Sequence, residues 1–199
     1  MAMKPLSSAI TIAPKATSSQ TSMLPTETGS HDLSSSEQTK AVAHLVAASD
    51  PAAVTRKVTD SVRTLIPSLK GKYTSNHDLL RYTISGKHDP ASISKAVRHV
   101  RQSLAGLPES DIEVQIAMMI PLLTLPKDMD DKMLSLKSRT LAAELTKYPA
   151  DIVLRSFDDV KKHATFFPSF AEFYKHIEWR YLPRKYLLDA LQKCIPMTA

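Results

Sequence analysis

The apolar residues of this chain recur at intervals of three and four positions, which is the spacing of one face of an α-helix. An alternation of apolar and polar residues, typical of a half-buried β-strand, never lasts beyond a few positions. Glycine is also scarce, with 4 glycines against 13 prolines in 199 residues, which disfavours a turn-rich β fold. The sequence therefore predicts an all-α protein, built as a compact multi-helix bundle.

The N-terminal 36 residues differ from the rest in composition, because Ser, Thr, Pro and Ala dominate and no aromatic residue occurs. Such a segment cannot bury enough apolar area to offset the entropy lost on ordering. We therefore expect residues 1–36 to form a disordered arm. Ser34 and Glu37 then have the spacing of a capping box, so folded structure is expected to begin there.

Residues 37–88 are predicted to form a helical lobe or extension. A first helix is expected over Thr39–Ala48 and a second over Pro51–Ile66, each with one apolar stripe. Asp50 can cap the second helix, since its carboxylate can accept hydrogen bonds from the free amides of the first turn. Residues 67–89 have few apolar side chains and two glycines, which predicts a loop with one short helix.

Residues 89–195 are predicted to form the main helical domain. A helix is expected over Pro90–Leu104, ended by Gly106 in the left-handed conformation. The segment Ile112–Leu125 is apolar nearly all round, which predicts the central helix of the core. Proline removes a helical hydrogen bond, so this helix should be kinked or broken near Pro121.

Ser110 and Glu113 form a capping-box pattern ahead of that central helix. A long amphipathic helix is expected next, over Asp128–Lys147. The apolar side chains expected to face the core from it are Met133, Leu134, Leu136, Leu141 and Leu145.

Three further helices are expected towards the C-terminus. One runs from Pro149 to near His163, and a second follows a capping box of Ser169 and Glu172. Pro183 is expected to end the second helix at about residue 182 and to open the last one, since proline suits the first position of a helix.

No motif of enzyme or cofactor chemistry is present in the sequence. The glycine-rich loops of nucleotide-binding proteins are missing, and the seven histidines form no HExxH or other metal-ligand spacing. The sequence therefore predicts a non-enzymatic protein with no catalytic residue, no metal and no cofactor. An unrecognised hydrolase or transferase site is kept as an alternative.

Cysteine usage and hydropathy indicate where the chain works. Cys194 is the only cysteine, which rules out an internal disulfide and favours a reducing compartment. The apolar runs are far shorter than the roughly 20 residues that a membrane span needs. The N-terminus lacks the hydrophobic region of a secretory signal. We therefore expect a cytoplasmic protein with no membrane contact, and no oligomeric state is predicted.

The chain carries a formal net charge of +6 and a sequence pI of about 9.4, which favours an acidic partner such as nucleic acid. Cations and aromatic rings gather near the C-terminus, where they suit phosphates and bases. The candidate residues for binding nucleic acid or a partner are Lys161, Lys162, Arg180, Arg184 and Lys185.

The aromatic residues nearby have the spacing of core residues, and this simpler interpretation leaves the cations as a solvated rim. The rings expected in the core are Phe166, Phe167, Phe170, Phe173 and Trp179.

The C-terminal half resembles small helical proteins of prophages and phage-derived regions of α-proteobacteria. The likeness covers about residues 111–191 and is carried by three segments, Tyr148–Val153 (YPADIV), Thr165–Phe173 (TFFPSFAEF) and Pro183–Leu191 (PRKYLLDAL). The arrangement of helix, Phe-Pro-Ser turn and helix more distantly resembles phage proteins that load or inhibit the replicative helicase. The resemblance implies a helical fold and a role in replication, with Arg184 and Lys185 as the family's basic pair.

The sequence thus favours a replication accessory or adaptor protein that docks on a larger protein partner such as a replicative helicase. One alternative is a direct nucleic-acid-binding protein without sequence preference. Another is a host-directed effector or interaction protein.

Overall fold

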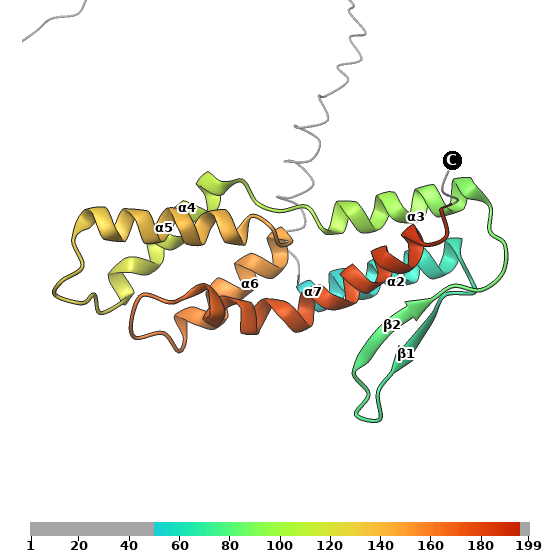
Figure 1. Cartoon of the computed structure of the whole chain (residues 1–199), viewed down its shortest axis with the longest axis horizontal. Helices are drawn as coiled ribbons and strands as arrows, with labels where there is room; N and C mark the ends of the chain where they lie inside the picture. The colour runs from blue at the N-terminus through green and yellow to red at the C-terminus, as the bar shows by residue number, and fades with distance from the viewer. Residues whose placement is uncertain (1–49, 196–199) are drawn as a thin grey trace, which may run out of the picture. The chain divides into compact units, whose positions relative to one another are not determined.

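The computed structural model describes residues 50–195, which form six α-helices, one short 3-10 helix and one β-hairpin (Figure 1). The expected all-α class is confirmed, with the hairpin as a small addition. The expected arm over residues 1–36 and the expected helix over Thr39–Ala48 lie outside the described residues. The elements in order are α2 (Pro51–Leu65), β1 (Lys70–Tyr73), β2 (Leu79–Thr83), α3 (Pro90–Ser103), α4 (Glu109–Met119), η1 (Ile120–Leu122), α5 (Asp131–Leu145), α6 (Ala150–Lys161) and α7 (Phe170–Gln192).

Helix starts follow the capping residues expected from the sequence. As expected, the carboxylate of Asp50 accepts a hydrogen bond from the backbone N–H three residues further on, at 3.2 Å. Asp89 caps α3 in the same way at 3.0 Å, although the sequence analysis did not name it as a cap. At the start of α7 the carboxylate of Glu172 accepts a 2.7 Å bond from the backbone N–H of Ser169, as a capping box requires. These predictions are confirmed because capping depends on residues three positions apart.

Residues 67–89 form a β-hairpin, so the expected loop with a short helix is wrong. Strands β1 and β2 pair antiparallel, with a register shift between Lys72 and Tyr73. In the turn, His77 adopts a positive φ of 65°, and the hydroxyl of Thr74 accepts hydrogen bonds from two backbone N–H groups. Strands of four and five residues with mostly exposed side chains are too short to show a two-residue period.

Helix α4 differs from the expected central core helix. Its N-cap is Pro108, so Ser110 and Glu113 lie inside the first turns and form no capping box. The helix ends at Met119 and passes into η1, which confirms the expected break near Pro121. The expected segment Ile112–Leu125 is apolar nearly all round, but α4 is buried on one side only. The buried side chains are Ile112, Ile116 and Met119, while Val114 and Met118 are exposed.

Helix α5 buries fewer of its apolar residues than expected. Leu141 and Leu145 are in the core and Leu134 is half-buried, but Met133 and Leu136 are exposed. The first two turns of α5 therefore present apolar side chains to the surface.

Gly106 is required for close packing rather than for a left-handed helix end. Positive φ angles within residues 50–195 occur only at His77 and Gly86. A Cβ atom at Gly106 would lie 2.3 Å from the carbonyl oxygen of Thr146, closer than any real contact. The expected left-handed conformation at Gly106 is therefore wrong.

Helix α7 runs without interruption through Pro183, so the two helices expected there are one. Its first half contributes Phe173 and Ile177 to one hydrophobic cluster, which also contains residues of α4, α5 and α6. Its second half contributes Leu187 and Leu191 to another cluster, which contains residues of α2 and α3. Figure 1 shows α6 beside the first half of α7 and α2 beside the second, and burial at both ends keeps the helix continuous across the proline.

The clusters combine segments that the sequence analysis separates. Helix α2 belongs to the expected lobe over residues 37–88 and α3 to the expected domain over residues 89–195, yet both pack in the second cluster.

Candidate functional site

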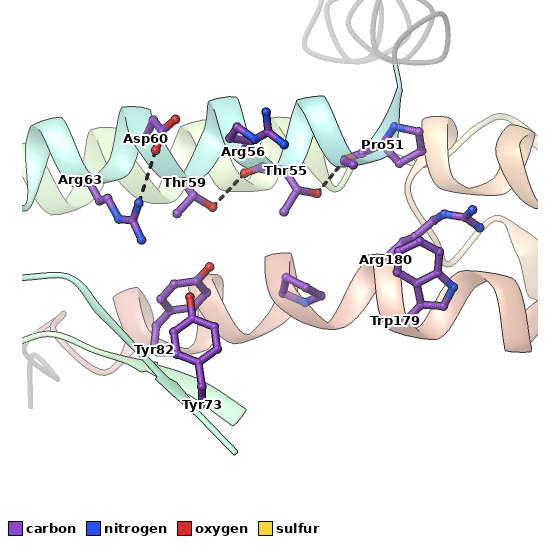
Figure 2. Close-up of a pocket in the computed structure, with 12 residues that line it drawn as sticks. Pro51, Thr55, Arg56, Thr59, Asp60, Arg63, Tyr73, Tyr82, Trp179 and Arg180 are labelled. Carbon is purple, nitrogen blue, oxygen red and sulfur yellow. Dashed lines mark hydrogen bonds and ion pairs between the residues drawn. The ribbon is translucent and has the colours of Figure 1, made fainter. Parts of the chain in front are cut away.

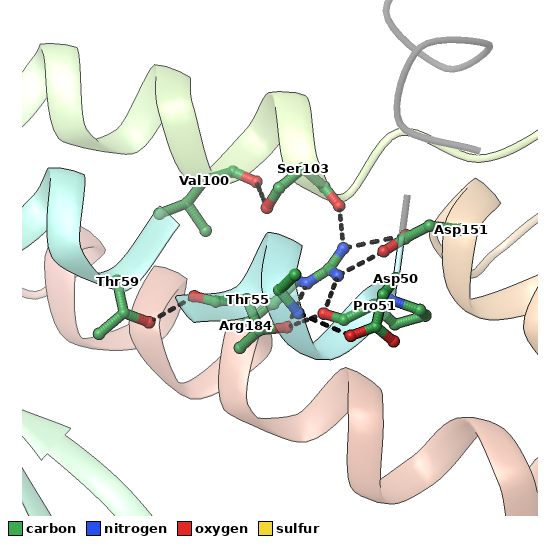
Figure 3. A network of polar contacts seen from close by, with 9 residues as sticks. Asp50, Pro51, Thr55, Thr59, Val100, Ser103, Asp151 and Arg184 are labelled. Carbon is green, nitrogen blue, oxygen red and sulfur yellow. Dashed lines mark hydrogen bonds and ion pairs between the residues drawn. The ribbon is translucent and has the colours of Figure 1, made fainter. Parts of the chain in front are cut away.

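A buried arginine lies where the two clusters meet. The guanidinium of Arg184 is fully buried and donates to four partners (Figure 3). It donates two bonds to the carboxylate of Asp151, at 3.0 and 2.5 Å, and two to the backbone carbonyls of Ser103 and Pro51, at 2.7 and 2.9 Å. Its Nε donates to the hydroxyl of Thr55 at 2.9 Å. All five N–H groups of the guanidinium are therefore satisfied.

The prediction that Arg184 belongs to a basic binding surface is wrong, because the side chain is enclosed and neutralised by Asp151. A signal was present in the sequence. Arg184 lies on the same helical face as Ile177, Leu187 and Leu191, all of which are buried. A cation within an apolar stripe indicates a buried, paired charge.

Next to this network, α2, the hairpin and α7 enclose a groove with a cavity of about 380 Å³ (Figure 2). Pro51 and Thr55 belong both to the Arg184 network and to the groove, so the buried network holds the groove's wall. The aromatic and cationic residues that line the groove are Arg56, Arg63, Tyr73, Tyr82, Trp179 and Arg180.

Trp179 is the largest ring in this groove and is 60% exposed, so its expected place in the core is wrong. The guanidinium carbon of Arg180 lies 4.2 Å from the centre of a Trp179 ring, within the range of a cation–π contact. The guanidinium therefore lies over one face of the indole, and Figure 2 shows the two side chains next to each other. The remaining surface can accept a flat ligand.

The hairpin supplies two tyrosines to the groove. Tyr73 is 55% exposed, whereas Tyr82 is half-buried. Burial raises the pKa of the Tyr82 phenol, and this outweighs the opposing effect of its contact with Thr59. The Tyr82 phenol is therefore neutral at physiological pH, and both rings offer apolar faces with hydroxyl groups at their edges.

Three arginines give the groove a positive charge. Arg63 pairs with Asp60 at 3.5 Å on the surface of α2, a contact too exposed to fix the guanidinium. Arg180 pairs with Asp159 at 2.8 Å. Arg56 forms no ion pair with any residue between 50 and 195. Only Asp60 among the lining residues is acidic, so the lining carries a positive excess.

Asp159 lies under this site, on α6, and is 16% exposed. Burial would raise the pKa of its carboxyl, but the hydrogen bond and charge of Arg180, with the charges of Arg155 and His176, hold that pKa below its ordinary value. The carboxylate therefore stays ionised at neutral pH.

Of the five candidate binding residues, only Arg180 lines the groove. Lys162 is exposed and its Nζ lies 3.7 Å from Asp159, so it is linked to Arg180 through this carboxylate. Lys161 lies over the ring of Phe157, and Lys185 is exposed on α7. Their roles in binding stay predictions.

The structure buries most of the other aromatic residues that were expected in the core, but not all of them. Phe173 is buried and Phe167 and Phe170 are partly buried, as expected, but Phe166 is 61% exposed.

Sequence reasoning missed the part of the groove that α2 and the hairpin provide. Arg56 and Arg63 stand seven positions apart on α2, which places them on one helical face and could have marked a basic stripe. Tyr73 and Tyr82 had no such signal, because the hairpin itself was not predicted.

Residues 50–195 contain no group of three or more His, Cys, Asp or Glu side chains arranged to hold a metal ion. Within the same residues, no helix is long and apolar enough to span a membrane. Comparisons with protein families, with curated proteins and with solved structures found no match to this chain.

Proposed function

We propose that this protein is a non-enzymatic binding protein that holds single-stranded nucleic acid in the groove between α2, the hairpin and α7. One observation carries the proposal: the exposed Trp179, stacked on Arg180, shares a cavity with two further arginines and two tyrosines. The site joins an open aromatic face to a positive lining.

This combination matches the chemistry of a single strand. Bases stack on aromatic rings whatever their sequence, and stacking contributes about 1–3 kcal/mol per base. Arginines bind phosphate oxygens through two parallel hydrogen bonds. In a duplex the faces of the bases are covered by their neighbours, so a stacking groove favours single strands over duplex.

The biological setting of the proposal comes from the sequence resemblance to phage proteins that act on the replicative helicase. Single strands form wherever a helicase works, so a cytoplasmic accessory of replication is the role that fits the groove.

Trp179→Ala tests the groove. Fluorescence anisotropy with a labelled oligo-dT strand should show affinity that falls steeply with salt, because phosphate contacts release counterions. The substitution should weaken binding about tenfold, given the contribution of one stacked base. Phe166→Ala is a matched control, since Phe166 is 61% exposed and does not line the groove. Equal affinities of the two variants, or no binding by the wild type at low salt, would reject the proposal.

A second candidate, an adaptor that docks on a protein such as a replicative helicase, is favoured by a separate surface. Leu136, Phe167 and Phe170 line an apolar hollow of about 420 Å³ beside α5. With a purified replicative helicase as partner, Leu136→Glu should abolish co-purification. Leu80→Glu is the control, because Leu80 is similarly exposed on the hairpin. Retention of the helicase by the Leu136 variant would exclude this surface.

A further inference from the structure

The carboxylate of Asp159 is surrounded by four basic side chains. Arg180 lies closest, with Nη2 at 2.8 Å, and the ring nitrogen of His176 lies at 3.9 Å. Arg155 and Lys162 are each 3.7 Å from its other oxygen. One negative charge thus stands among three permanent cations and a histidine. The cluster therefore has a net positive charge, which can attract a second anion.

Arg180 joins this cluster to the groove. One of its terminal nitrogens donates to the backbone carbonyl of His176 at 2.8 Å, and the other to Asp159. The flat face of the same guanidinium covers Trp179. The atoms that would bind a phosphate beside a stacked base are therefore held by an internal carboxylate.

We propose that Asp159 occupies the place of a ligand phosphate and so limits the affinity of the groove for single-stranded nucleic acid. The inference rests on the proposed function. A phosphodiester next to the base on Trp179 competes with Asp159 for Arg180, and Arg155 and Lys162 hold the displaced carboxylate.

The competition follows from the chemistry of the two anions. Carboxylate and phosphate oxygens engage a guanidinium in the same forked geometry, so one replaces the other at the same donors. Asp159 also lowers the positive potential at the groove, which weakens the attraction for a polyanion.

Asp159→Asn tests the inference, with Asp158→Asn as its matched control. Asp158 is the preceding residue of α6 and is exposed, and its substitution changes the net charge equally. With the oligo-dT probe, Asp159→Asn should raise affinity about fivefold more than Asp158→Asn does, the size typical of one partly solvated ion pair. Equal gains in the two variants would show a general charge effect and overturn the inference.

Asp159→Ala, with Asp158→Ala, repeats the test in the event that the asparagine variant does not fold, because alanine favours the helix. In an Arg180→Gln background the advantage of Asp159→Asn over Asp158→Asn should disappear, since the contested donor is gone. An advantage that persists there would overturn the inference.

The outcomes separate this inference from the proposed function. Wild-type protein that does not bind oligo-dT overturns both. Binding that needs Trp179 but gains nothing specific from Asp159→Asn keeps the groove and overturns the role of Asp159.

Discussion

Two neighbouring cations on α7 have opposite surroundings. Arg184 is enclosed and Lys185 is exposed, although both were expected on one basic surface. The difference depends on Asp151, which lies 33 positions earlier in the chain and supplies the compensating charge. A helical face can be assigned from sequence, but a partner at that separation cannot, because it depends on how the helices pack.

Arg184→Met should reduce the free energy of unfolding by about 3–5 kcal/mol, because it leaves the carboxylate of Asp151 buried without its partner. The double variant Arg184→Met with Asp151→Leu should regain much of that loss, since no buried charge remains. Urea denaturation followed by circular dichroism measures both. Lys185→Met, on the exposed neighbour, should stay within about 0.5 kcal/mol of the wild type. A similar loss of stability at both positions would show that the unpaired carboxylate of Asp151 is not its cause.

Asp159 should make stability depend on pH at the acid end. Arg180, Arg155, His176 and Lys162 surround its carboxylate, and its pKa is lowered from 3.8 in the folded protein. A lowered pKa means that ionisation stabilises the fold, so the contribution is complete above about pH 4 and is lost as pH falls further. Below pH 5 the stability difference between wild type and Asp159→Asn should shrink as pH falls, because the carboxylate becomes protonated. A stability difference that grew as pH fell through this range would mean that ionisation of Asp159 destabilises the fold.

Some features of the secondary structure could be predicted from the sequence and others could not. Local signals located the starts of α2 and α7, because a capping residue and its backbone partners are neighbours in the chain. The start of α3 was placed at Pro90 without its cap. The hairpin and the continuity of α7 were missed because packing decides them. The hairpin is held against α7 through β2, and Pro183 lies in a helix buried at both ends. Tertiary contacts outweigh local preference at these places.

Pro183→Ala should stabilise the protein by about 1–3 kcal/mol, because alanine restores the N–H that proline lacks and removes a clash with the preceding turn. The midpoint of urea unfolding is the measurement. Pro183 also lines the groove, so oligo-dT affinity is measured in parallel. Lower stability in this variant would show that the proline ring is needed for packing.

At the scale of the whole molecule, the described residues have two hydrophobic clusters joined by one helix and one buried ion pair. The sequence predicted a main helical domain over residues 89–195 and a helical lobe or extension over residues 37–88. The packing of α2 with α3 and α7 joins residues on both sides of that boundary, and no local pattern reveals such pairings.

The shared helix and the Arg184 network should make the clusters unfold together. Hydrogen exchange read out on α3 and on α5 should give the same opening free energy in the wild type. In Arg184→Met the opening free energies of the two helices should differ. Helix α3 should exchange first, because its cluster is the smaller. Equal exchange in this variant would show that α7 alone couples the clusters.

Trp179 is the only tryptophan in the chain, and it lines the proposed groove. Its emission therefore comes from one site, without background from another indole. A base stacked on it would quench that emission, and loss of the Arg180 cation would change its wavelength. The protein thus contains its own optical reporter, and an unlabelled strand can be titrated against it directly.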